Sequence, residues 1–239
     1  MEQAEQIDAP VVRRQRRRKR FAPTPARMRF EAIHAEIRER ICLLHYPPGH
    51  TLVESELARE FGISRTPIRR VLQRLEFEGL VESRHGVGTI VTLIDVKALL
   101  QIDSLRMKLA EISGEMTLLP LDDDGIGRMK LLLDCCGGLR TRVDQDEFGR
   151  LSIALQQEVS RSIGNLPLRD VSDRLFFQTY RMWLQVLPRM DWAEEVEAFS
   201  SEIADVIQAA ELNDLPSLHF TRRNHISMSR TRMKGYFGQ

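Results

Sequence analysis

Residues 54–74 constrain the fold of this chain most, because their pattern predicts two short helices joined by a tight turn. In the first helix, Leu57 and Phe61 stand four residues apart and share one face, which we expect to point inward. Gly62 follows and supplies the backbone freedom that a tight turn between helices requires. Pro67 falls in the first turn of the second helix, where a missing N–H costs little. The segment is therefore predicted to be a helix-turn-helix.

The second of these helices has two contrasting faces. Ser64 is a good N-cap for it, and its apolar stripe consists of Ile68, Val71, Leu72 and Leu75. Its polar face consists of Arg65, Arg69 and Gln73, four residues apart, with Thr66 beside them. Arginine bonds guanine edges or phosphates and small hydroxyls bond either, so this face is typical of a recognition helix in the DNA major groove. The alternative is a solvated charged face on an ordinary helical hairpin.

A predicted β-hairpin follows directly. Residues 80–83 and 89–92 are short strand-like runs, and residues 84–88 between them contain His85 and Gly86. A helix-turn-helix followed by a β-hairpin is a winged helix, whose basic tip would reach phosphate or the minor groove. The combination favours DNA binding over a plain helical hairpin.

The motifs of residues 28–93 resemble the N-terminal domain of the GntR family of bacterial transcription regulators, FadR subfamily. The resemblance rests on residues 52–54, 57–58, 62–69, 72, 75–76 and 78–81 and on the Gly86/Gly88 wing. It implies that base and phosphate contacts come from Ser64, Arg65, Thr66, Arg69, His85 and Gly86. One position departs from the family pattern, since Ser55 stands where the family often has arginine, with Arg59 a turn later.

The charge distribution suits contact with nucleic acid at one end of the chain. The net charge is only +1, yet residues 13–20 hold seven cations in eight positions. We expect residues 1–24 to be a disordered basic arm, either touching phosphates without sequence preference or serving as a solvated tail.

The cysteines and the hydropathy of the chain indicate the cellular compartment in which the protein is expected. The three cysteines, Cys42, Cys135 and Cys136, show neither a CxxC pair nor zinc spacing, which favours reduced thiols. No apolar run approaches the roughly 18 residues of a membrane span, and the N-terminus lacks a secretory layout. A cytoplasmic protein is expected.

From Asp95 to about Tyr236 the periodicity is helical, and we find no convincing strand. Helices are predicted near residues 96–118, 123–140, 145–163, 166–187, 191–211 and 214–235. The predicted fold is mainly α, with a winged helix-turn-helix at residues 25–94 and an all-α bundle of about six helices at residues 95–239. The helix order again resembles FadR-type regulators, whose C-terminal FCD domain binds an effector and dimerises.

The resemblance also bears on metal binding. Most FCD domains hold a metal with one Asp and three His, and the corresponding positions here are Ser152, Gln156, Ile203 and His225. A lone imidazole with Ser and Gln cannot hold a divalent transition metal well, because such sites need several imidazole or carboxylate donors. We therefore predict no bound metal and no cofactor.

A polar cluster is expected to remain in the helical domain. It consists of Ser152, Gln156 and His225 and, from the first helix of the domain, Arg106, which by the resemblance matches a family arginine that can pair with carboxylate effectors. Arginine binds a carboxylate bidentately and the other three add hydrogen bonds, so the cluster is predicted to bind a small organic effector, a carboxylate. Arg106 could instead be a structural partner of Glu111 or a neighbour, and His225 a core histidine, whereas His219 is expected at the surface.

The sequence thus predicts a DNA-binding transcriptional regulator, most simply a repressor. It would act as a homodimer on a palindromic operator, because two-fold symmetry doubles the contacts of one recognition helix. The alternative is an architectural DNA binder with a degenerate, ligand-free helical domain. An enzyme is not expected, since no nucleophile–base pair or phosphate-binding glycine loop stands out.

Overall fold

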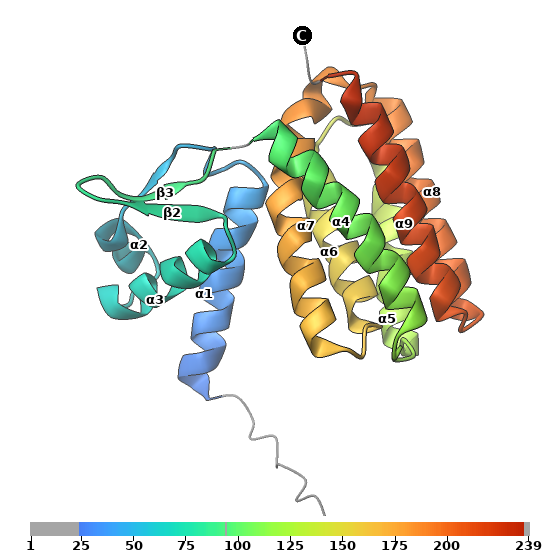
Figure 1. The fold of residues 1–239 in the computed structure, drawn as a ribbon, viewed down its shortest axis with the longest axis horizontal. Helices are drawn as coiled ribbons and strands as arrows, with labels where there is room; N and C mark the ends of the chain where they lie inside the picture. Colours follow the sequence, from blue (N-terminus) through green and yellow to red (C-terminus); the bar gives the residue numbers. More distant parts are fainter. Residues whose placement is uncertain (1–23, 94, 237–239) are drawn as a thin grey trace, which may run out of the picture.

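The computed structural model describes residues 24–93 and 95–236, which form a winged helix followed by a helical bundle (Figure 1). The first part consists of α1 (Pro25–Cys42), β1 (Thr51–Leu52), α2 (Glu54–Glu60), α3 (Arg65–Phe77), β2 (Val81–Arg84) and β3 (Gly88–Val91). The second consists of α4 (Val96–Glu115), α5 (Asp123–Gly138), α6 (Gln145–Arg161), α7 (Leu166–Val186), η1 (Leu187–Arg189), α8 (Trp192–Glu211) and α9 (Leu215–Lys234). The predicted fold class is confirmed. The basic run at residues 13–20 lies outside the described residues.

The winged helix is built around a small antiparallel sheet of strand order β1-β3-β2. Thr51 pairs with Ile90, and Arg84 pairs with Gly88 beside the hairpin turn. Gly62 adopts a φ of 62°, the left-handed conformation that the turn between α2 and α3 was expected to need. The apolar stripe of α3 is buried against α1. Ser64 is the N-cap residue of α3, but its side chain makes no capping hydrogen bond.

Each α-helix of the bundle begins with an acidic or amide side chain at its N-cap. These side chains accept a backbone N–H from the first turn, and the residues are Asp95, Asp122, Asp144, Asn165, Asp191 and Asp214. A cap of this kind stabilises a helix by about 0.5–2 kcal/mol relative to alanine. The local signals in the sequence therefore set the starts of these helices close to where we predicted them.

The end of α4 differs from the prediction. The helix was expected to reach residue 118 but stops at Glu115. The next residues instead pair with the turn after α6, since Leu118 forms an isolated bridge with Ile163 and the Gly164 N–H donates to the Thr117 carbonyl at 2.9 Å. A contact between segments distant in sequence thus ends the helix before its local pattern does.

Gly164 is the residue that this bridge depends on. A Cβ added there would lie 2.8 Å from the Thr117 backbone oxygen and 3.1 Å from its Cγ2. The oxygen has little room to retreat because it accepts the Gly164 N–H. We expect Gly164→Ala to lower the free energy of unfolding by about 1–3 kcal/mol, measured by urea denaturation.

Gly127→Ala is the matched control for that variant. Gly127 lies inside α5, and nothing lies within 4 Å of a Cβ added to it. Alanine there should leave stability unchanged or raise it by up to about 1 kcal/mol, because alanine favours helix more than glycine does. If the two variants unfold with the same free energy, the bridge is not a packing constraint.

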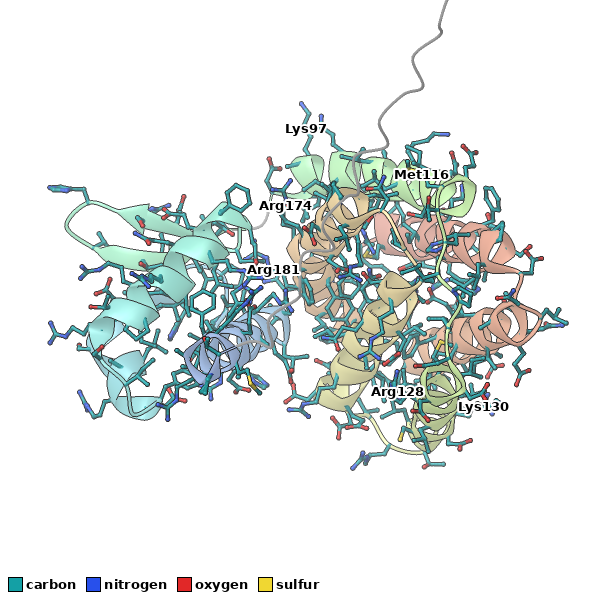
Figure 2. All side chains as sticks on the ribbon, turned by 90° about the horizontal axis from the view of Figure 1, so that it is seen from below. Lys97, Met116, Arg128, Lys130, Arg174 and Arg181 are labelled. Carbon is teal, nitrogen blue, oxygen red and sulfur yellow. The ribbon has the colours of Figure 1, made fainter. Side chains whose placement is uncertain are left out.

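Helix α7 packs against α4 and α6 in the bundle and also touches α1 of the winged helix. Phe176, Tyr180 and Trp183 are buried in the core. On another side of the helix, the Gln178 amide donates to the Glu78 carbonyl at 2.6 Å. Arg181, which lies at the boundary between the two parts in Figure 2, donates to the carbonyl and hydroxyl oxygens of Thr92.

Candidate nucleic-acid interface and ligand cavity

The polar face of α3 is exposed along its whole length. Arg65, Thr66, Arg69 and Gln73 are all exposed, as is the N-cap Ser64. The neighbouring Ile68 and Leu72 are buried, so the helix is held by one side and presents the other. With this geometry the predicted recognition side chains stand on the surface that would face a DNA groove.

Arg69 has a partner that the sequence did not indicate. Its Nε and Nη2 atoms donate to the two carboxylate oxygens of Glu54, each at 2.9 Å. Hydrogen bonding from the guanidinium lowers the pKa of Glu54 and, in return, raises the pKa of Arg69. Any phosphate or base contact by Arg69 must therefore compete with an existing bidentate pair.

The wing places its predicted contacts at the tip of the hairpin. His85 and Gly86 are exposed in the turn between β2 and β3. Arg84, just before them, pairs with Glu82 at 2.7 Å while remaining half exposed. The hairpin extends away from the helical bundle on the same part of the molecule as α2 and α3 (Figure 1).

The helical bundle contains a cavity of roughly 750 Å³ of unoccupied space, including the part that opens to solvent. Three of the four residues predicted to bind an effector line it: Arg106 from α4, Ser152 from α6 and His225 from α9. Gln156 instead lines a smaller neighbouring cavity, which Arg106 also borders. The structure therefore brings the cluster together around Arg106, with Gln156 set to one side.

Arg106 is 14% exposed and pairs with a neighbour, Asp103, which was one of the two structural partners expected, and not with Glu111. Its Nη1 donates to Asp103 Oδ1 at 3.0 Å and to Thr179 Oγ1 at 2.9 Å. Glu111 is committed elsewhere, to Lys108 at 2.7 Å and Arg223 at 3.1 Å, so it is not the structural partner. Burial lowers the pKa of Arg106, and Asp103 opposes that shift.

The other residues predicted to bind an effector are engaged by polar groups within the protein. Ser152 Oγ donates to the Phe148 carbonyl at 3.0 Å. Gln156 donates to Asp173 at 3.1 Å and accepts from Arg222 at 3.0 Å. His225 Nε2 lies 3.2 Å from Asp205 Oδ2.

Sequence reasoning missed several residues of the cavity wall. They include Asp103, Tyr180, Glu202 and Arg222. A signal for Arg222 was present, because it precedes His225 by three residues and so shares its helical face. Nothing in the local sequence marks Glu202 as its ion-pair partner.

His219 was expected at the surface, and that prediction is wrong. Its side chain is buried and its Nε2 lies 2.9 Å from Ser162 Oγ. The residue follows the buried Leu218 on the side of α9 that packs into the bundle. Desolvation lowers the pKa of His219 to about 4.

The donor set at the four family metal positions does not fit a metal. Ile203 is fully buried and apolar, Ser152 is bonded to backbone, and Gln156 is engaged by Asp173 and Arg222. Only His225 offers a strong donor. In the part of the chain that the structure describes, no three His, Cys, Asp or Glu residues are grouped as metal ligands.

Two further properties concern the described residues as a whole. Cys42 and Cys136 are buried free thiols, while Cys135 is exposed, and burial raises the pKa of Cys42 to about 12. None of the helices in residues 24–93 and 95–236 combines the length and the hydropathy needed to cross a bilayer.

Comparisons with known proteins agree with this architecture. Residues 30–91 match the model for bacterial regulatory proteins of the gntR family. Over 147 residues, the chain is 33% identical to an uncharacterized HTH-type transcriptional regulator in an unstable DNA locus of Streptomyces ambofaciens, a match that covers 61% of each chain. Over 102 residues, it is 28% identical to the HTH-type transcriptional regulator YdhC of Bacillus subtilis, a match that covers 43% of this chain and 44% of that protein. The chain thus spans about half the length of these curated relatives.

The overall fold is shared with a solved structure. McbR/YncC of Escherichia coli superposes with a TM-score of 0.71 over 88% of this chain and 99% of that one, at 15% identity. The likeness covers the winged helix and the helical bundle together. Both curated relatives carry the name of a transcriptional regulator, not of an enzyme. Residues 30–91 therefore match the gntR family of bacterial regulatory proteins, and the chain as a whole shares its fold with McbR/YncC.

Proposed function

We propose that the chain is a transcriptional repressor that binds a palindromic operator as a homodimer and is regulated by a small carboxylate. The observation that carries the proposal is the exposed row Arg65, Arg69 and Gln73 on a helix whose opposite face is buried. Ser64 and Thr66 stand at the start of that row, where a recognition helix meets base edges. His85 and Gly86 would follow the backbone or the minor groove from the wing. The operator lies on the chromosome, which places the chain in the bacterial cytoplasm.

The outward face of α4 supports the homodimer. It carries apolar residues at alternating spacings of four and three: Ala98, Ile102, Leu105, Leu109, Ile112 and Met116. Leu105, Ile112 and Met116 remain 48%, 42% and 44% exposed. Such spacing suits two helices packed side by side, so a second copy could cover this face. In Figure 2, Lys97 and Met116, near the two ends of α4, lie along the outer edge of the helical domain.

The position of Arg106 supports the carboxylate ligand. It lines the cavity, and its Nε and Nη2 atoms form no hydrogen bond with the described residues. A carboxylate could use these donors without breaking the pair with Asp103. Ser152 and His225 border the same space and would complete its polar surroundings.

Helix α7 offers a route by which a ligand could change DNA affinity. Thr179 and Tyr180 line the cavity, while Gln178 and Arg181 bond to the winged helix. A ligand that prefers one placement of α7 would shift the winged helices between arrangements, and thus the spacing of the two recognition helices. Repression follows if the operator-binding arrangement covers a promoter.

The experiment that tests the function is selection of duplexes from a random pool, followed by sedimentation of the complex. We expect enrichment of an inverted repeat whose half-sites lie about one helical turn, roughly 10 base pairs, apart. We also expect two chains per duplex and affinity that falls with salt. A chain that remains monomeric and enriches no sequence at low salt would overturn the proposal.

A further inference from the structure

The charges on the wall of the bundle cavity cancel. Its acids are Asp103, Glu195 and Glu202, and its arginines are Arg106, Arg222 and Arg232. Each arginine pairs with one acid: Arg106 with Asp103 at 3.0 Å, Arg222 with Glu202, and Arg232 with Glu195 at 2.5 and 3.1 Å. His225 also lines the cavity, and its Nε2 lies 3.2 Å from Asp205 Oδ2, just outside the wall. The wall therefore carries both signs of charge and no net charge.

These pairs do not use all of the bonding capacity that faces the cavity. Arg106 donates only through Nη1, and its partner Asp103 accepts only through Oδ1. The Tyr180 hydroxyl is buried and has no hydrogen-bond partner among the described residues, although Tyr180 lines the cavity. A buried hydroxyl without a partner is unfavourable, so a polar ligand atom beside it would be stabilising.

The cavity wall is also aromatic, and the Arg106 guanidinium carbon lies 5.4 Å from the centroid of one of its rings, that of Phe176. Its rings belong to Phe148, Phe176, Tyr180, Trp183 and Phe199. Neighbouring rings are in contact: the ring centroids of Phe148 and Trp183 lie 4.8 Å apart, and those of Phe176 and Tyr180 lie 5.1 Å apart. Aromatic rings prefer offset or edge contacts with other rings, so this wall suits a flat aromatic body.

The cancelled charge restricts the ligand. A ligand that carries only a carboxylate would leave one net negative charge in a partly buried, poorly solvated space, which is unfavourable. A ligand that carries only an ammonium group would leave one net positive charge. A ligand that carries both groups can place the carboxylate beside Arg106 and the ammonium beside Asp103 or Glu202. It then preserves neutrality while each of its charges gains a partner.

We infer that the cavity binds an aromatic zwitterion, with one carboxylate, one ammonium group and no net charge. The inference rests on the proposed function, because it specifies the class of the carboxylate ligand. Such a ligand differs from a plain carboxylate because its binding needs the acidic side chains of the cavity wall as much as it needs Arg106. Asp103 would be the binding residue for the ammonium group.

Isothermal titration calorimetry of the full chain with four related probes tests this inference. Phenylalanine carries both charges, 3-phenylpropanoate only the negative charge, 2-phenylethylamine only the positive charge, and 3-phenylpropanol neither. We expect phenylalanine to bind at least tenfold more tightly than each of the other three. Failure of phenylalanine to bind, or equal or tighter binding of any of the other three, would overturn the inference.

Two charge-neutralising variants provide a reciprocal test. Arg106→Gln leaves the wall with a net negative charge, so preference should move from phenylalanine toward 2-phenylethylamine. Asp103→Asn leaves it with a net positive charge, so preference should move toward 3-phenylpropanoate. Shifts in the same direction for both variants would contradict the charge-matching argument. The probe series on the unaltered chain decides the question if either variant does not fold.

Operator binding, measured on the same preparations without probe, separates this inference from the proposed function. Tight binding of 3-phenylpropanoate alone would reject the zwitterion but leave a carboxylate-regulated repressor intact. If the unaltered chain shows no specific DNA binding, the proposed function is rejected, whatever the calorimetry shows.

Discussion

Replacing Arg65 by alanine should weaken binding to the selected operator by about 1–3 kcal/mol, a loss of roughly 5- to 150-fold in affinity. Arg65 is the first residue of α3 and is exposed. A side chain at this position of a recognition helix points to base edges, where a bidentate contact discriminates between bases. Fluorescence anisotropy with the operator and a scrambled duplex would measure both affinity and specificity.

Arg142→Ala is a suitable control, because Arg142 is an exposed arginine beyond α5 in the helical domain and pairs with Asp144. Its loss should leave operator affinity unchanged. We expect Arg69→Ala to weaken binding as well, by an amount within the same range. Unchanged specific binding in both Arg65→Ala and Arg69→Ala would defeat the assignment of α3 as the recognition helix.

The pair between Arg69 and Glu54 adds a sharper expectation. Glu54→Gln should tighten operator binding, because it frees the Arg69 guanidinium and removes a negative charge near the phosphates. In the Arg69→Ala background, the release of Arg69 no longer contributes, so Glu54→Gln should have a smaller effect. A double-mutant cycle on operator affinity measures the difference. Equal effects in both backgrounds would mean that Arg69 does not bind DNA through the atoms that Glu54 now holds.

Acidification should destabilise the helical domain through His219. Its pKa falls from 6.5 to about 4 in the folded chain, because the ring is 2% exposed and charging it there is unfavourable. The unfolded chain therefore binds more protons than the folded chain between these two values. Stability is fully present above about pH 6.5 and falls as the pH drops toward 4, by about 3 kcal/mol.

Urea denaturation at several pH values between 7 and 4 would measure this contribution. Carboxylates also titrate in this range, so the comparison is with His219→Gln, which can still bond to Ser162 but cannot take up a proton. The free energy of unfolding of the variant should depend less on pH, with the difference appearing below about pH 6.5. Identical pH profiles for the two proteins would show that His219 is not held neutral by burial.

The sequence indicated the elements of the fold well because its signals are local. Helices α4 to α9 begin close to the predicted positions, each after an Asp or Asn that caps its own first turn. The turn between α2 and α3 needed only the backbone freedom of Gly62. Where a distant contact intervened, as at Leu118 and Ile163, the local prediction of the helix end was wrong.

The candidate sites show the same division. The row Arg65, Arg69 and Gln73 could be identified from spacing, because residues four apart share a helical face in any helix. The cavity residues Arg106, Ser152 and His225 were named from family position, and they line one space. Sequence reasoning did not foresee that Gln156 would border a separate small cavity or that His219 would be buried.

By itself, then, the sequence determined the helices, the wing and the exposed face of α3, since periodicity and capping act within one or two turns of chain. Only the tertiary structure decided which charged side chains are paired and which polar groups are buried. Glu54 of α2 pairs with Arg69 of α3, and Glu202 of α8 pairs with Arg222 of α9. Gln178 reaches Glu78 across 100 residues of chain. Such pairings depend on how separate elements pack, and that packing also made the cavity neutral.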